Sequence, residues 1–162
     1  MACFAEYDSP VGRLLLESDG QSLTGLWMGR ELDPEWTPGG DVPVLLQVRD
    51  WLGAYFRGEV LPVNFPLNPR GTAFQKQVWE ILLTIPFGQT RSYGSIAREM
   101  ALRLGKERMS AQAVGGAVGR NPISILIPCH RVLGSQGRLT GYAWGLDRKR
   151  WLLEHEGIEY QK

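Results

Sequence analysis

Apolar and polar positions alternate over three short stretches at the start of the chain. Residues 2–7, 13–18 and 22–28 are apolar or alternating runs, and turn-forming residues separate them at 8–12 and 19–21. A period of two is typical of strands, and short turns containing Asp, Gly and Pro connect antiparallel neighbours. The pattern therefore predicts a three-stranded antiparallel meander.

The next apolar positions have the period of a helix. Residues 31–41 are rich in Pro, Gly and acidic residues and predict a loop before it, and Gly58 is a natural end for it. The meander and this helix together predict an α/β N-terminal domain. The apolar residues of the helix recur at intervals of three and four and share one face: Val44, Leu45, Val48, Trp51, Leu52, Tyr55 and Phe56.

A linker divides the chain. Residues 61–71 contain three prolines, which exclude a helix interior there. We therefore expect two domains, one over residues 1–66 and one over residues 67–162.

The second domain is predicted to be mostly helical. Thr72 and Gln75 have the spacing of a capping box at the start of its first helix. Ser92 and Ser110 are candidate N-caps of two further short helices joined by a turn, which is the helix-turn-helix arrangement. The inward face of the first helix is predicted to carry Phe74, Val78, Ile81, Leu82 and Ile85.

The last third of the chain predicts a strand, a loop and a final helix. Residues 123–127 have the composition of a short buried strand, and residues 134–145 form a glycine-rich loop. Asp147 is the predicted N-cap of the closing helix, and Gly157 its end.

The second helix of the helix-turn-helix has an unusual composition. DNA-reading helices usually present Arg, Asn, Gln or Lys to base edges, whereas this helix offers mostly Ala and Gly. Glycine costs about 1 kcal/mol relative to alanine inside a helix, so adjacent Gly115 and Gly116 require a reason. Either the backbone approaches a partner closely without reading its sequence, or the helix packs closely against another helix of the same protein. The residues alone leave both readings open.

Charge is distributed unevenly between the two halves of the chain. Lys and Arg against Asp and Glu number 5 against 10 in residues 1–70 and 13 against 7 in residues 71–162, which gives −5 and +6. A basic half favours contact with an anion, and nucleic acid is the common case. Ordinary scatter of charges over solvated faces is the alternative.

Composition limits the cofactors and the compartment. No apolar run approaches the roughly 18 residues of a membrane span, and the first ten residues lack the features of a secretory signal. Cys3 and Cys129 lie far apart, with no Cys and His spacing typical of zinc, so we expect no metal and no cofactor. A reducing intracellular compartment is expected, with Cys129 a free thiol.

Cys129 and His130 are the candidate chemical groups. Adjacent residues point to opposite faces of a strand and about a quarter-turn apart on a helix, so cooperation between them needs a break, which Pro128 makes plausible. A base or a cation lowers the pKa of a reactive thiol, and His130 and Arg131 supply both. A buried structural thiol is the alternative. Glu156 opposes the dipole at the end of the last helix, so its position is either incidental or serves to hold another group.

Motifs over nearly the whole chain resemble those of the O6-alkylguanine-DNA alkyltransferases. PCHRV, followed about a dozen residues later by GY and at the end by LLxHEG, is a highly specific combination. The resemblance implies a ribonuclease H-like N-terminal α/β domain and a mostly helical, winged helix-turn-helix C-terminal domain. The segments that carry it are residues 8–16, 74–82, 92–97, 113–122 and 120–157.

The resemblance implies a relay of side chains that activates Cys129. His130 would reach the thiol through a bound water, and Glu156 would hold His130 in the required tautomer. Cys129 would sit in a turn leaving the buried strand, and Asn121 would join its own turn to the cysteine segment by side-chain hydrogen bonds. The thiolate would take the alkyl group from O6 of guanine, and by the same chemistry from O4 of thymine, once per protein molecule.

Recognition of the base is implied in the same way. Tyr93 would crowd the phosphate of the target nucleotide and drive the base out of the stack. In the pocket, Tyr93 would contact the minor-groove edge of the guanine. The backbone carbonyls of Cys129 and Val132 would accept hydrogen bonds from the exocyclic amine of the base. Tyr142 would pack on the base and, with the Ala143 N–H, stabilise the leaving O6. Ser135 and Trp144 are further expected pocket residues.

The implied partner is double-stranded DNA that contains O6-alkylguanine. The second helix of the helix-turn-helix, with its face of small Ala and Gly residues, would bind it in the minor groove. We expect a monomer that does not bind membranes, in the cytoplasm at the nucleoid or in a nucleus, and not secreted. The residues expected to bind DNA are Thr72, Ser92, Tyr93, Gly94, Ala111, Gln112, Ala113, Gly115 and Gly116.

The sequence departs from the family pattern at three places. Gln112 stands where the family commonly has an arginine that fills the gap left by the flipped base. The segment between the two helices is longer than in some relatives, and its Arg103, Lys106 and Arg108 either contact phosphates or form a solvated turn. Trp144 stands where some relatives have glycine, which suggests a narrower pocket or a side chain that only packs the loop.

Three other functions compete with alkyl transfer. A non-catalytic damage-binding relative would lack the cysteine, which is present here. A cysteine hydrolase would need an oxyanion hole and turnover, and it would leave the helix-turn-helix unexplained. A DNA-binding regulator would need a helix that reads bases.

Overall fold

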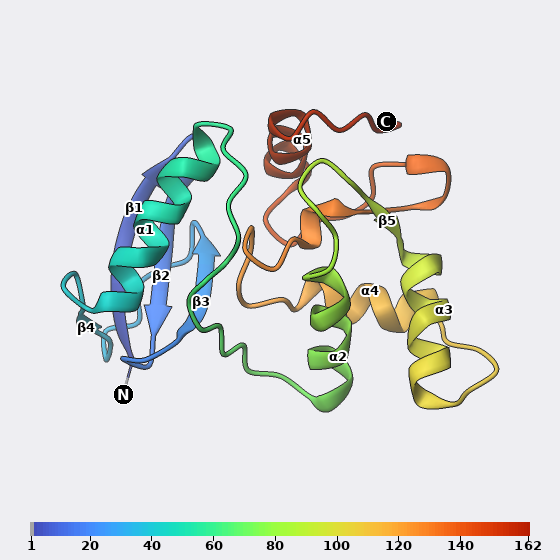
Figure 1. Ribbon diagram of the computed structural model, residues 1–162, viewed down its shortest axis with the longest axis horizontal. Helices are drawn as coiled ribbons and strands as arrows, with labels where there is room; N and C mark the ends of the chain where they lie inside the picture. Colours follow the sequence, from blue (N-terminus) through green and yellow to red (C-terminus); the bar gives the residue numbers. More distant parts are fainter. Residues whose placement is uncertain (1) are drawn as a thin grey trace. The chain divides into compact units, whose positions relative to one another are not determined.

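The computed structural model describes residues 2–162 and divides the chain into two compact units (Figure 1). The first unit contains the chain up to Arg70 and, in addition, Pro122–Leu126. The second contains Gly71–Asn121 and Ile127–Lys162. Inclusion of residues 122–126 in the first unit was not predicted from the sequence. Within residues 2–162 no helix combines the length and apolar character that a membrane crossing needs.

The first unit is a sheet with a helix on one face, as predicted (Figure 1). Strands β1 (Cys3–Ser9), β2 (Gly12–Ser18) and β3 (Leu23–Met28) form the antiparallel meander. A short strand, β4 (Thr37–Pro38), adds to β1 in parallel and makes the sheet mixed, in the order β3-β2-β1-β4. β4 was not predicted, because two residues are too few to show the alternation of apolar and polar positions that marks a strand. Its proline is tolerated because β4 lies at the edge of the sheet.

Helix α1 (Pro43–Phe56) packs its apolar face on β1 and β2. Most of the predicted face is buried, whereas Trp51 and Phe56 are only half-buried. Trp51 stacks on Tyr55 with ring centroids 5.4 Å apart. After the helix, Gly58 adopts a φ of 88°, a conformation that favours glycine and turns the chain away.

The predicted strand over residues 123–127 is wrong. Only Ile123 pairs, as a single parallel bridge to Leu26, because Leu26 N donates to Pro122 O and accepts at its own carbonyl from Ser124 N. The chain then turns sharply, with Ile125 at a φ of 70°. The segment is nevertheless buried, as its apolar composition indicated. The sequence indicated that this segment is buried, but it did not show that only one of its residues would pair with a strand.

The second unit consists mainly of helices with the predicted local start signals. Helix α2 (Ala73–Leu82) begins with both hydrogen bonds of the Thr72–Gln75 capping box. Helix α3 (Tyr93–Leu104) is capped by Ser92, and α4 (Ala111–Gly119) by Ser110. Trp79 on α2 is buried and donates from Nε1 to Ala117 O at 2.9 Å, a contact that joins α2 to α4.

Two features of this unit differ from the prediction. Strands β5 (Arg91–Ser92) and β6 (Val132–Leu133) form a short parallel pair that local pattern could not indicate. Helix α5 (Leu146–His155) begins after Gly145 with no side-chain cap, so Asp147 lies in its first turn and is not the N-cap. Gly157 follows the helix at a φ of 73°.

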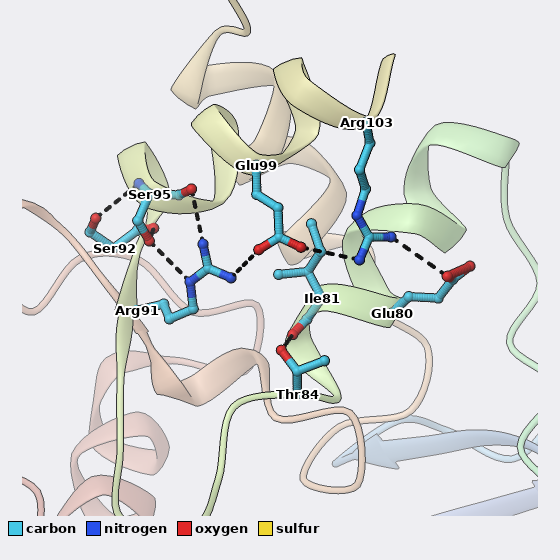
Figure 2. A network of polar contacts seen from close by, with 8 residues as sticks. All are labelled: Glu80, Ile81, Thr84, Arg91, Ser92, Ser95, Glu99 and Arg103. Carbon is cyan, nitrogen blue, oxygen red and sulfur yellow. Dashed lines mark hydrogen bonds and ion pairs between the residues drawn. The ribbon is translucent and has the colours of Figure 1, made fainter. Parts of the chain in front are cut away.

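A chain of ion pairs joins α3 to its neighbours (Figure 2). Arg91 Nη1 lies 2.6 Å from Glu99 Oε1, and Arg103 Nη2 lies 3.1 Å from Glu99 Oε2. Arg103 also reaches Glu80 on α2 at 3.6 Å. Arg103, one of the three cations expected either to contact phosphates or to face solvent, therefore serves within the protein.

Candidate active site

Cys129 begins a short 3₁₀ helix, η1 (Cys129–Arg131), directly after Pro128. Cys129 N donates to Ile127 O at 2.8 Å, and Arg131 N donates to Pro128 O at 2.9 Å. We expected Cys129 to lie in a turn that leaves a strand. The structure instead places it at the start of a 3₁₀ helix. Cys129 and His130 are 6% and 0% exposed, so the chemical groups are inside the second unit.

Donors from three residues converge on Glu156 at the C-terminal end of α5. His130 Nε2 lies 2.6 Å from Glu156 Oε2. Arg131 donates from Nε to Oε1 at 2.7 Å and from Nη2 to Oε2 at 3.1 Å, and Gly88 N donates to Oε1 at 3.1 Å. These contacts explain why a carboxylate stands at the unfavourable end of a helix dipole. Glu156 holds the histidine and the arginine that follow the cysteine.

Electrostatics fix the tautomer of His130. Burial raises the pKa of Glu156, but the hydrogen bonds and charges of His130 and Arg131 outweigh burial and hold that pKa well below its usual range. An ionised carboxylate only accepts hydrogen bonds, so the proton of the neutral ring is assigned to His130 Nε2.

Nδ1 of His130 is then the basic atom. Burial lowers the pKa of His130, so the ring is neutral at pH 7. Nδ1 is buried and has no hydrogen-bond partner in the part of the chain that the structure describes. The arrangement presents a neutral imidazole whose second nitrogen is oriented by a carboxylate, as in histidine bases that accept a proton during a reaction.

Cys129 is a thiol at rest. Burial raises its pKa, while Asn121, the charge of Lys149 and Tyr142 favour the thiolate without cancelling the effect of burial. The Arg131 guanidinium does not serve the thiol: it donates to the Glu156 carboxylate, and its Nη1 donates to the Ile85 carbonyl at 2.7 Å.

Asn121 follows α4 and reaches the cysteine segment. Its Nδ2 donates to Ile127 O at 2.8 Å, and the residue is buried. A single side chain thus fixes the backbone two residues before Cys129 and also bonds to the thiol itself.

Lys149 is a buried residue at this site that sequence reasoning missed. It is 0% exposed, and its Nζ donates to Val132 O at 2.8 Å and to Gly141 O at 3.2 Å. Burial lowers the pKa of Lys149 to about 8, so the ammonium is mostly charged at pH 7. A signal existed: Lys149 has helical spacing to Leu152 and Glu156, which are buried, but the flanking arginines made it resemble a solvated lysine.

Tyr93 is the first residue of α3 and is partly buried. The hydroxyl of Thr140 donates to its Oη at 3.4 Å. Burial raises the pKa of Tyr93, the hydrogen bond with Thr140 lowers it, and the neighbouring Cys129 raises it further. Its ring lies 3.8 Å from where a Cβ on Gly115 would stand, so Tyr93 rests on the glycine of α4.

The remaining expected pocket residues lie at or near the glycine-rich loop. Val132 is buried, and its carbonyl already accepts from Lys149. Tyr142 has a buried hydroxyl that interacts with Cys129, and Trp144 is half-buried. Ser135 and Ala143 are exposed.

Ala111, Ala113 and Gly116 on α4 face solvent, whereas Gly115 is half-buried and Ala117 is buried. A Cβ at Gly116 would meet nothing within 4 Å, and one at Gly115 would make only ordinary contact with Tyr93. Close packing against another helix therefore does not explain either glycine. Of the two explanations that the sequence left open, close approach of the helix backbone to a partner remains. The other expected DNA-binding residues are exposed or partly buried: Thr72, Ser92, Tyr93, Gly94, Ala111, Gln112 and Ala113.

Among residues 2–162 there is no group of three or more His, Cys, Asp and Glu side chains that could hold a metal ion.

Comparisons with known proteins agree with this two-domain fold. The family model "6-O-methylguanine DNA methyltransferase, ribonuclease-like domain" matches residues 3–69, and "6-O-methylguanine DNA methyltransferase, DNA binding domain" matches residues 73–158. The chain belongs to the 6-O-methylguanine DNA methyltransferase family.

Relatives match over nearly their full length. A methylated-DNA–protein-cysteine methyltransferase of Haemophilus influenzae is 47% identical over 161 residues, which cover 97% of this chain and 87% of the relative. The crystal structure of Mycobacterium tuberculosis O6-methylguanine methyltransferase is 47% identical with a TM-score of 0.83, covering 96% of this chain and 93% of that one. A structure of the mycobacterial protein in complex with DNA has the same TM-score of 0.83, with coverage of 94% and 91%.

Proposed function

We propose that this protein repairs double-stranded DNA directly, by moving the alkyl group of O6-alkylguanine to the sulfur of Cys129 in a single turnover. The observation that carries the proposal is a buried thiol beside a histidine whose tautomer is set by Glu156 at 2.6 Å. The family match gives the reaction class, and this geometry supplies the nucleophile and the base. Transfer from O4 of thymine uses the same groups.

The resting thiol and the neutral imidazole define the proton path. As the alkyl carbon approaches, the Cys129 proton passes to His130 Nδ1 through a bridging water, and Glu156 stabilises the imidazolium that forms. The sulfur–carbon bond forms as the carbon–O6 bond breaks, and the electron pair goes to O6 and the ring. N1 of the guanine then takes up a proton, which balances the proton lost by the thiol and restores the keto form of the base. The Tyr142 hydroxyl and the Ala143 N–H are the proposed donors to the leaving oxygen.

The product explains why each molecule acts once. An S-alkylcysteine is a thioether, and no group at the site can remove its alkyl substituent. Asn121 and Lys149 act through the backbone: they hold Ile127 O and Val132 O, which flank the cysteine. The reaction therefore consumes the protein and needs no cofactor.

Access to O6 requires the base to leave the stack, at a cost of a few kcal/mol. Tyr93, at the start of α3 and against Gly115, is the proposed residue that displaces the nucleotide, and the exposed small face of α4 lies in the minor groove. Gln112 is exposed on α4 and takes the place left by the base through its amide, without a charge. Thr72, Ser92 and Gly94 contact the backbone of the DNA in this proposal.

Organisation and location follow from the substrate. The region 67–162 carries DNA binding and transfer, and the region 1–66 supports it. The protein acts as a monomer within the cell, in the cytoplasm at the nucleoid or in a nucleus.

Restoration of guanine in DNA tests the proposal. A duplex with one O6-methylguanine inside a restriction site is incubated with increasing protein, and cleavage of the site reports repair. We expect repair to saturate at one event per protein, to vanish in Cys129→Ser, and to persist in the matched variant Cys3→Ser. Repair beyond one event per protein, or lesion binding without repair, would contradict the proposal.

A further inference from the structure

A groove of about 520 Å³ runs between α3 and the turn of residues 105–110 that joins α3 to α4. Its apolar lining is formed by Ala97, Ala101, Leu102 and Met109. Leu102 is 82% exposed, so most of its apolar side chain is open to solvent at the groove. The groove therefore presents apolar surface to a partner outside the chain.

The rim of the groove is positively charged. Arg98, Lys106 and Arg108 stand along it against one carboxylate, Glu107, and all four residues are exposed. The side chains of the three cations make no hydrogen bond or ion pair to any residue that the structure describes. Arg103, on the same helix, is the contrast, because Glu99 and Glu80 hold it (Figure 2).

The turn that forms the groove is fixed at both ends. Gly105 ends α3 at a φ of 64°, and Lys106 N donates back to Ala101 O at 2.9 Å. At the other end, the Ser110 hydroxyl accepts from Gln112 N and Ala113 N at the start of α4. A turn held by two caps keeps the cationic rim in place before any partner binds.

The groove is continuous with the surface proposed to bind DNA. Gly94 near the start of α3 and Ala111 at the start of α4 both line it. A duplex that lies on α4 therefore has its sugar–phosphate backbone within reach of the groove. The C–H faces of deoxyribose rings match the apolar lining residues, and phosphates match the guanidinium and ammonium groups along the groove.

We propose that this groove is a second DNA contact, which holds the sugar–phosphate backbone beside the segment that α4 engages. The inference rests on the proposed function, because it concerns the same DNA. Lys106 and Arg108 bind phosphates there, and Leu102 packs on a deoxyribose. The longer segment between the two helices thus enlarges the DNA-binding surface without adding sequence specificity.

The salt dependence of binding to an unmodified duplex tests this inference. The slope of log K against log salt becomes shallower by about 0.9 for each phosphate of B-DNA that the protein no longer neutralises. We expect the slope to become shallower by about that amount in Lys106→Gln and in Arg108→Gln, and the effects to add in the double variant. Arg103→Gln is the matched control: it removes the same charge from the same region, and its slope should equal that of the wild type.

Two further measurements separate this inference from the proposed function. Leu102→Ser should weaken duplex binding at every salt concentration without changing the slope, and all variants should reach the wild-type transfer rate at saturating duplex. A wild-type slope in the double variant, or a control whose slope changes as much as that of Lys106→Gln, would overturn the groove as a DNA contact. Failure of the wild-type protein to restore guanine would instead overturn the proposed function, whatever the slopes.

Discussion

Burial sets the resting state of the reactive residues. Cys129 is kept as a thiol and His130 as a neutral ring, because the low-dielectric interior disfavours both charged forms. A buried thiol reacts slowly with small oxidants and with stray electrophiles in solution. In the proposed mechanism the thiol proton moves only when an alkyl carbon is in place, so a protein that acts once is not spent on the wrong reaction.

Glu156 links this chemistry to stability. Its pKa in the folded protein lies below the value of 4.5 for an unperturbed glutamate, so its contribution to stability is present above pH 4.5 and is lost as the pH falls below that value. In Glu156→Gln, the buried Arg131 loses its partner, at a cost of about 3–5 kcal/mol in the free energy of unfolding. Denaturant titrations at neutral pH should show this loss, and the variant should lose less additional stability than the wild type below pH 4.5.

Glu154→Gln is the control on the same helix, because Glu154 is exposed. It should remain within about 0.5 kcal/mol of the wild type and keep its transfer rate. If Glu156→Gln transferred methyl groups at the wild-type rate, the carboxylate would have no part in orienting His130.

Trp144 is the residue expected to limit the size of the alkyl group. It is half-buried on the loop that carries Tyr142, and its carbonyl accepts from Arg148 Nη1 at 3.4 Å. In Trp144→Gly, the rate with O6-benzylguanine should rise by roughly tenfold, while the rate with O6-methylguanine in DNA changes little. Rate measurements with both substrates decide the matter, and an unchanged benzyl rate would mean that the side chain only packs the loop.

At the scale of elements, Gly116 on α4 is expected to affect protein stability and DNA binding in opposite directions. An added Cβ at Gly116 would meet nothing within 4 Å, so Gly116→Ala should stabilise the helix by about 0.4–1 kcal/mol. If the backbone here approaches DNA closely, the same methyl group should weaken duplex binding by about tenfold. Thermal unfolding and a binding titration measure the two effects. A variant that is more stable and binds DNA as well as the wild type would remove α4 from the interface.

The elements also show what the sequence could reveal. Ser92, Ser110 and the Thr72–Gln75 pair were readable because a cap is a local interaction within four residues. The β5–β6 pair was not readable, because its partners stand 41 residues apart, from Arg91 to Val132. At the site, the motif identified Cys129 and His130, whereas the burial of Lys149 depends on carbonyls brought together by the fold.

At the scale of the whole molecule, the charge division follows the compact units. Residues 122–126 carry no charge, so the two units retain the −5 and +6 counted for residues 1–70 and 71–162. The basic unit is the one that matches the family's DNA-binding domain. The positive charge therefore lies where an anionic partner is expected.

The first unit completes its structure with five residues from the middle of the second. A fragment of residues 71–162 would expose Ile123 and Leu126, whose burial is worth roughly 1.5–3 kcal/mol per side chain. It would also release the backbone just before Cys129. We expect this fragment to unfold at a lower temperature and to transfer methyl groups more slowly than the full chain, which calorimetry and rate measurements can check. Equal stability of the two would show that the segment needs no partner.

The intact mass of the protein after reaction with a duplex containing one O6-methylguanine is the decisive measurement for suicide transfer to Cys129. We expect one added methyl group per protein, located on Cys129 by peptide mapping and absent in Cys129→Ala. An unchanged mass with tight binding to the lesion would make the protein a damage sensor, and a methyl group on Cys3 would show that Cys129 is not the acceptor.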